Sequence, residues 1–215
     1  MRDVRILIQR AREAGLLDRL RIRMGLPLEF YLQAVHPVVE TYAAHLHQRA
    51  RSQCNSTDQP DRLLMDGLEL AGFALAFRQG RILPMYAAPE EIGERAHRWT
   101  YAVFLTALLH PGLSPCSGSR LSGSSLKEGA MSPSNLLVDF ERIVPGSVLD
   151  WLCADTGLRA ELHAFLLGSE SGEQSTIGRL IKQAQEEFSR IRGHSCAGSG
   201  SECGCLLYTS PSPRD

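Results

Sequence analysis

The sequence lacks the features of a membrane-spanning, secreted or zinc-finger protein. Its 215 residues contain no apolar run close to the roughly 20 residues that cross a bilayer. Met1 is followed by charged residues and not by a signal peptide. The six cysteines show no paired Cys-x-x-Cys spacing, which excludes a zinc-finger pattern. We therefore expect a reduced, cytoplasmic protein with no membrane association.

An excess of charge of one sign is also missing, as are the motifs of several enzyme classes. The net charge is -1 at pH 7, so nothing global indicates nucleic-acid binding, although a local basic patch stays open. There is no Walker-type glycine loop and no Gly-x-Ser-x-Gly elbow, which excludes an ATPase or a serine hydrolase. Alternating β-branched runs and Asn-Gly turns are absent, which argues against a sheet-rich fold.

Apolar residues instead recur at helical spacing along most of the chain. The longest apolar run, WTYAVFLTALLHPGLSP at 99–115, predicts a buried helix that carries His110 at its end and is stopped by Pro111 and Gly112. Pro89 starts a helix that leads into it. Further helices are predicted over residues 2–24 (broken near Gly15), 28–49 (bent at Pro37), 62–78 (interrupted at Asp66-Gly67), 135–143, 145–152, 157–167 and 176–191. The predicted fold class is all-α, a multi-helix orthogonal bundle.

The chain is expected to form one helical domain over residues 1–193. A serine- and glycine-rich stretch at 116–134 predicts a flexible linker within it. Residues 194–215 are expected to be a disordered tail. Its last part, CLLYTSPSPRD at 205–215, looks like a translated sequencing adapter and is left out of the fold. Whether the natural chain continues beyond residue 193 stays open.

Arginines are dense near the N-terminus and recur before the central helix. The candidate nucleic-acid-binding residues are Arg19, Arg21, Arg23, Arg95 and Arg98, because guanidinium groups contact phosphates. A solvated helix face is the alternative for each of them. If the N-terminal arginines line one surface, salt-sensitive DNA binding is expected; if they scatter, it is not.

Three stretches, in one order, resemble the HD-superfamily module of TraI-type (MobH) relaxases of conjugative and integrative elements. They are PVVETYAAHLH at 37–47, LLMDGLELA at 63–71, similar to the family pattern L-L-x-H-G-L-E-V-A, and RWTYAVFLTALLHP at 98–111. Residues 143–168 also resemble the segment before the family's last helix. The resemblance covers about 16–192. It implies an HD-like helical fold and a part in DNA processing, with DNA and conjugation-machinery proteins as partners.

The resemblance also implies where a divalent metal would be held, and most of these positions are substituted. Asp66 stands where the family has its first histidine, Pro111 follows His110 in place of an aspartate, and Gln185 replaces a later aspartate. Only His110 is retained, and a hydrolytic metal centre needs three or more protein ligands. Asp66 and His110 are thus expected to be remnants of a metal site, with no catalytic residue and no cofactor assigned.

Three functions stay open from the sequence. The first is a catalytically degenerate relaxase-like module, a pseudoenzyme acting as an accessory or interaction domain in conjugative transfer. The second is an active phosphohydrolase or nickase that binds Mn, Mg or Fe through Asp66, His110 and a carboxylate such as Asp58, Asp61 or Glu69. The third is a plain helical protein-interaction module. The sequence does not indicate the oligomeric state.

Overall fold

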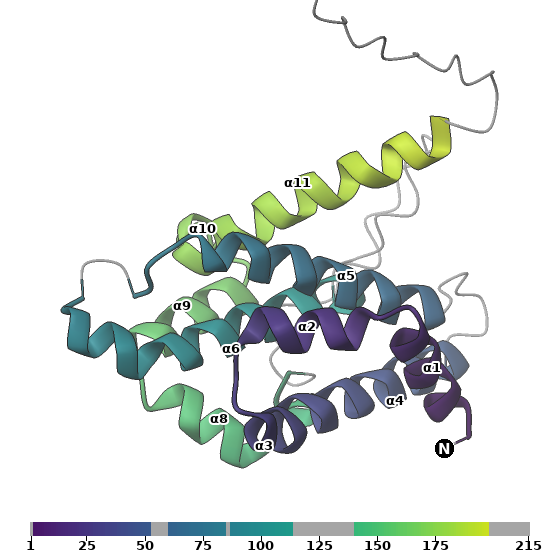
Figure 1. Cartoon of the computed structure of the whole chain (residues 1–215), viewed down its shortest axis with the longest axis horizontal. Coiled ribbons are helices and arrows are strands. Elements are labelled where there is room, and N and C mark those ends of the chain that lie inside the picture. Colours follow the sequence, from purple (N-terminus) through teal and green to yellow (C-terminus); the bar gives the residue numbers. More distant parts are fainter. Residues whose placement is uncertain (1, 53–59, 85–86, 114–139, 198–215) are drawn as a thin grey trace, which may run out of the picture.

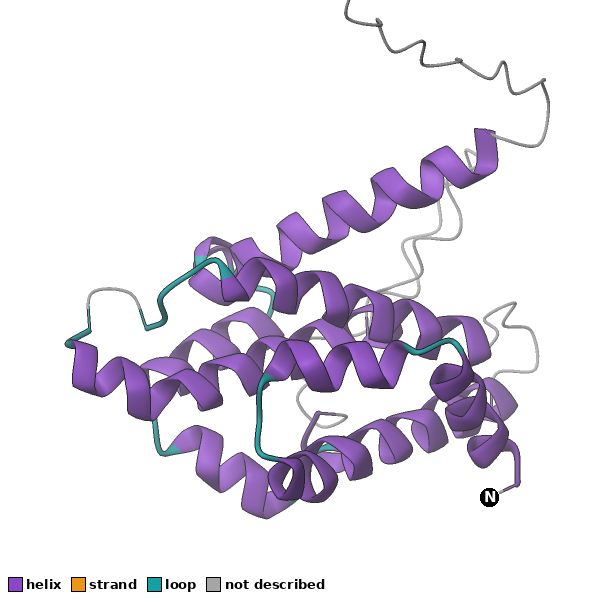
Figure 2. Cartoon of the chain, viewed as in Figure 1, coloured by secondary structure: helices purple, strands orange, loops and turns teal. Residues whose placement is uncertain are grey.

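The computed structural model is helical, and it describes residues 2–52, 60–84, 87–113 and 140–197 (Figure 2). No strand occurs in these ranges, which confirms the predicted all-α fold. In chain order the helices are α1 (Arg2–Glu13), α2 (Leu16–Met24), α3 (Leu28–Phe30), the π-helix η1 (Tyr31–Val35), α4 (His36–Ser52), α5 (Pro60–Gln79), α6 (Pro89–Leu113), α8 (Gly146–Cys153), α9 (Thr156–Leu166), α10 (Glu170–Gln174) and α11 (Thr176–Ala197). None of these helices combines the length and the apolar composition that a bilayer crossing needs.

The N-terminal helices follow the predicted pattern, with one refinement. Gly15 separates α1 from α2 with a φ of 67°, a left-handed conformation that favours glycine. The predicted bend near Pro37 takes the form of a π-helical turn immediately before it, in which the His36 N–H bonds to the Tyr31 carbonyl. Proline lacks an N–H and crowds the preceding turn, so a widened turn lets the chain pass through Pro37 without a break.

Helix α5 is the centre of the bundle. It packs against α6, α11, α2 and α4, and Figure 1 shows α2 and α11 lying along it. Residues 101–109 of α6 are all buried, as the apolar run predicted. Two predicted boundaries are wrong: α5 runs through Asp66 and Gly67 without interruption, and α6 ends at Leu113 instead of stopping at Pro111 and Gly112. Both glycine and proline are therefore accommodated in helices that tertiary packing stabilises.

Gly67 is in α5 because the helix crosses α6 there at close range. A Cβ atom added at Gly67 would lie 2.5 Å from the Leu108 carbonyl oxygen, a backbone atom that cannot move aside. The glycine that looked like a helix interruption in the sequence is thus a packing requirement of the α5–α6 crossing.

The C-terminal helices close the bundle. Residues 140–143 are helical, and α8 begins at Gly146 directly after Pro145, as predicted. Asp155 caps α9 by accepting a hydrogen bond from the Leu158 N–H at 3.1 Å. The short α10 had no counterpart in the sequence analysis, and α11 extends to Ala197, past the predicted start of the tail at residue 194. The predicted linker at 116–134, residues 135–139 of the predicted helix and residues 198–215 lie outside the described residues.

We expect Gly67→Ala to lower the free energy of unfolding by about 1–3 kcal/mol, because the new methyl group forces α5 away from α6. Gly93→Ala is the matched control: Gly93 is also helical, but an added Cβ there meets nothing within 4 Å. That change should be neutral or stabilising by about 0.5–1 kcal/mol, the usual effect of alanine over glycine in a helix. Urea denaturation measures both; equal effects of the two substitutions would contradict the close crossing.

Candidate functional site

Asp66, the first position at which a remnant of a metal site is predicted, lies on α5 and is engaged by an arginine from α11. Nη1 of Arg192 donates a hydrogen bond to Oδ2 of Asp66 at 2.8 Å, and Nη2 donates a second to Oδ1. The Asp66 side chain is only 13% exposed. Nε of Arg62, one turn earlier on α5, lies 3.8 Å from Oδ2. The carboxylate charge is thus neutralised by a bidentate guanidinium pair, the strongest form of charge-assisted hydrogen bond.

Arg192 is itself held in place by packing on α11. Its guanidinium carbon lies 4.5 Å from the centre of the Phe188 ring, one turn earlier on the same helix. An aromatic face attracts a guanidinium group and restricts its rotamers. Arg192 also approaches Glu69 of α5, with 3.9 Å between Nη2 and Oε2. The guanidinium group is therefore fixed over Asp66 from three directions.

His110, the second predicted remnant position, lies in the last turns of α6 and faces α11. Nε2 of Gln185 lies 3.1 Å from Nε2 and 3.3 Å from Nδ1 of the imidazole. The Phe165 ring of α9 flanks it, with 6.0 Å between ring centres. Burial lowers the pKa of His110 below its ordinary value of 6.5, so the imidazole is neutral at pH 7.

The structure therefore brings together two positions that the sequence analysis named, His110 and Gln185, and gives Asp66 a partner that it missed. Gln185 and Arg192 are about two helical turns apart on α11, so both side chains leave the same face. This spacing was the one available signal for Arg192. It identifies a shared face but not what that face meets across the bundle.

The donor atoms at these positions do not fit a hydrolytic metal centre. Both oxygens of Asp66 accept hydrogen bonds from Arg192, His110 faces a neutral amide, and Pro111 offers no side-chain ligand atom. Within the described ranges, no group of three or more His, Cys, Asp or Glu side chains is placed to hold a metal ion. Such centres use three or more imidazole and carboxylate ligands.

The additional carboxylates of the active-hydrolase hypothesis do not complete this set. Asp61 pairs with Arg10 of α1. Glu69 is 41% exposed and approaches Arg192. Asp58 lies outside the described residues.

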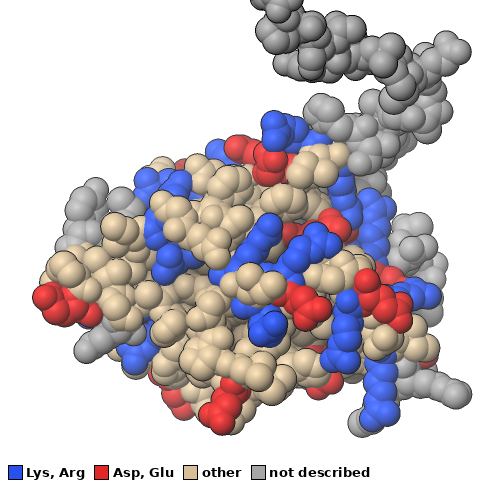
Figure 3. Space-filling model, in the orientation of Figure 1, with Lys and Arg blue, Asp and Glu red and all other residues tan. Residues whose placement is uncertain are grey.

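The candidate DNA-binding arginines separate into two groups. Arg19, Arg21 and Arg23 lie on α2, where Arg19 and Arg23 border one groove with α5 and α11. Arg95 and Arg98 lie on α6 and turn toward α8 and α9: Nε of Arg95 is 3.7 Å from Oδ2 of Asp155, and Arg98 is 5.8 Å from the centre of the Trp151 ring. Figure 3 shows lysine and arginine side chains gathered in the middle of one face, where α2 lies in Figure 1.

The buried His110 predicts a loss of stability on acidification. Because its pKa is lower in the folded state, the unfolded chain binds a proton first as the pH falls below about 6.5. The free energy of unfolding should then decrease with a slope of at most about 1.4 kcal/mol per pH unit, until the folded state is protonated too. His110→Gln should flatten this part of the profile, because it removes the group whose pKa burial lowers. Urea denaturation at a series of pH values between about 7.5 and 5 measures the free energy of unfolding as a function of pH. If His110→Gln had the same pH profile as the wild type, the assignment of this loss of stability to His110 would be contradicted.

Comparison with known protein families shows a similarity over the N-terminal half of the chain. The model of the TraI_2 family, described as "Putative helicase", matches residues 3–117, which is more than half of the 215 residues and spans α1 to α6. No curated protein and no solved structure matches the chain. The TraI-type part of the resemblance is thereby confirmed, while the relation to HD proteins stays a prediction. The chain belongs to the TraI_2 family.

Proposed function

We propose that this protein is a relaxase-like module without metal-dependent catalysis, which acts as a DNA-processing accessory or interaction domain in conjugative transfer. Membership of the TraI_2 family supports the link to DNA processing. The bidentate pair between Arg192 and Asp66 is the observation that supports the loss of catalysis. Its partners would be DNA and proteins of the conjugation machinery, in the cytoplasm, and it would need no metal cofactor.

The pair opposes metal binding for an electrostatic reason. Arginine stays protonated in proteins, so the positive charge beside Asp66 is permanent. A divalent cation at the same carboxylate would have to displace two charge-assisted hydrogen bonds and then lie near the displaced guanidinium group. With 13% of the Asp66 side chain exposed, water screens this repulsion only partly.

The side chain that contacts His110 also opposes metal binding. Gln185 carries no charge, so it contributes none of the negative charge that balances a divalent ion. One imidazole and one neutral amide make a weaker donor set than the carboxylates and imidazoles that bind first-row metals. The two active-site remnants are thus used as side-chain contacts that fasten α11 to α5 and α6.

A cleavage and binding assay tests the proposal. We expect labelled single-stranded and double-stranded oligonucleotides to be bound but not cut when Mn²⁺, Mg²⁺ or Fe²⁺ is added, because no competent metal centre forms. The variant His110→Ala is the negative control, and any cleavage that it shows is the background of the assay. Metal-dependent cleavage that disappears in His110→Ala would establish the active nickase instead. Absence of DNA binding at low salt would favour the plain protein-interaction module.

A further inference from the structure

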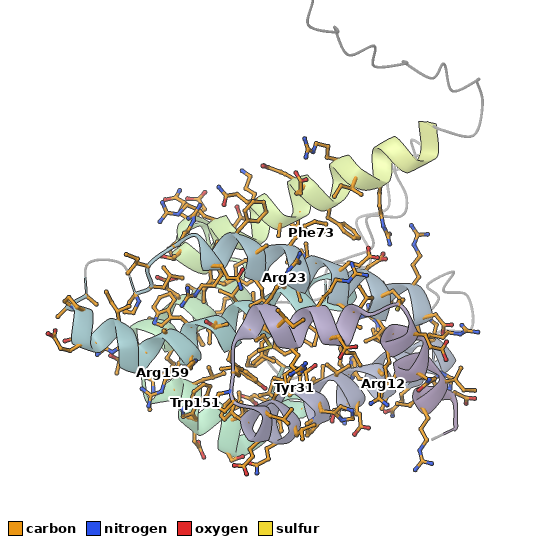
Figure 4. The ribbon with its side chains drawn as sticks, in the orientation of Figure 1. Arg12, Arg23, Tyr31, Phe73, Trp151 and Arg159 are labelled. Carbon is orange, nitrogen blue, oxygen red and sulfur yellow. The ribbon has the colours of Figure 1, made fainter. Side chains whose placement is uncertain are left out.

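A groove lies between α2, α5 and α11, next to the Asp66 position, because Arg192 lines the groove and also binds Asp66. Its volume is about 280 Å³. Apolar residues from all three helices line it, together with four charged side chains. The charged residues are Arg19, Arg23, Glu69 and Arg192, and the other lining residues are Leu16, Leu20, Leu68, Gly72, Phe73, Phe188 and Ile191. Figure 4 shows Arg23 and Phe73 in neighbouring positions between α2 and α11.

The charge of this groove is positive in a chain whose net charge is -1. Arg19, Arg23, Arg192 and Glu69 line it, and with the charge of Arg192 paired to Asp66, Arg19 and Arg23 still exceed the single carboxylate of Glu69. Nη1 of Arg23 donates to the Gly72 carbonyl at 2.6 Å, and Arg19 donates through Nε and Nη2 to the carbonyls of Gly15 and Ala14. A guanidinium group has five N–H donors, so these bonds fix both side chains and leave further donors for an anion.

The groove also offers aromatic surface beside these charges. Phe73 and Phe188 lie with 6.5 Å between ring centres at an angle of 63°, and Arg192 stacks on Phe188. Aromatic rings and guanidinium planes are the groups on which the bases of single-stranded nucleic acids stack. Both phenylalanines are partly exposed and not fully enclosed in the core.

We propose that this groove binds a nucleotide of single-stranded DNA, with the base against Phe73 and Phe188 and the adjacent phosphate on Arg19 and Arg23. Its volume is near the lower limit of small-molecule sites, which suits one splayed-out nucleotide and not a stacked duplex. Arg192 is already paired with Asp66, so Arg19 and Arg23 are the charges that favour a phosphate here. This inference rests on the proposed DNA-processing function and gives it a location.

The test is fluorescence anisotropy of the full chain with a labelled oligothymidine of about 12 nucleotides, titrated at several salt concentrations. We expect Phe73→Leu, which keeps apolar volume but removes the ring, to weaken binding by about fivefold or more. Arg19→Gln should reduce the slope of log K against log salt by about 0.7, the value for one phosphate contact on a single strand. Glu69→Gln should tighten binding, because it removes the carboxylate that repels the phosphate.

Arg21→Gln is the matched control. Arg21 is an exposed arginine on the same helix that does not line the groove, so its removal tests general basicity alone and should change affinity less than Arg19→Gln. Thermal unfolding of each variant identifies those that fail to fold. If other variants fail to fold, Glu69→Gln still tests the groove, because it replaces a partly exposed side chain with one of similar size.

The failures of the two proposals are distinguishable. If the wild type binds the strand but Phe73→Leu, Arg19→Gln and Glu69→Gln bind as Arg21→Gln does, the groove assignment is overturned and the DNA-processing function stands. If the wild type binds no DNA, both fail. If a polyglutamate peptide at equal concentration displaced the oligonucleotide, the proposal that the groove binds a nucleotide would be overturned, and an acidic protein would be the better candidate for its ligand.

Discussion

The Arg192–Asp66 ion pair joins the last helix to the centre of the bundle, beside the buried apolar residues of α11. A carboxylate with 13% of its surface exposed is costly unless a counter-charge is hydrogen-bonded to it. Arg192 provides that counter-charge across 126 residues of sequence and ties α11 to α5. The contact between Gln185 and His110 adds a second link, from α11 to α6, about two turns earlier on α11.

These two links give the substitutions at the expected metal positions a common physical meaning. A metal ion joins helices by sharing ligands from several of them. Here the α5, α6 and α11 side chains are joined directly, through a guanidinium pair at Asp66 and an amide at His110. The family match covers α1 to α6, whereas both partner side chains come from α11, outside the matched residues. The family match therefore gives no information on the helix that supplies the partners.

Local sequence rules predicted the helices well because their signals are local. Gly15, Pro89 and Pro145 marked boundaries correctly, and the apolar run before His110 is buried as expected. The errors came where tertiary packing overrides propensity. Gly67 looked like an interruption, but it serves the approach of Leu108. The family resemblance grouped Asp66, His110 and Gln185 as expected metal positions. Nothing local indicates that Arg192 meets Asp66, because that contact exists only after α11 has docked on α5.

A double-mutant cycle on Asp66→Asn and Arg192→Met, followed by urea denaturation with chelator present, measures the central interaction most directly. We expect a coupling free energy of about 1–3 kcal/mol, because the pair is largely shielded from water on the Asp66 side. Adding Mn²⁺ in place of the chelator should leave the wild-type stability unchanged, since only a bound ligand raises it. A coupling near zero would contradict the ion pair, and a stabilisation by Mn²⁺ that His110→Ala abolishes would show that a metal site survives at these positions.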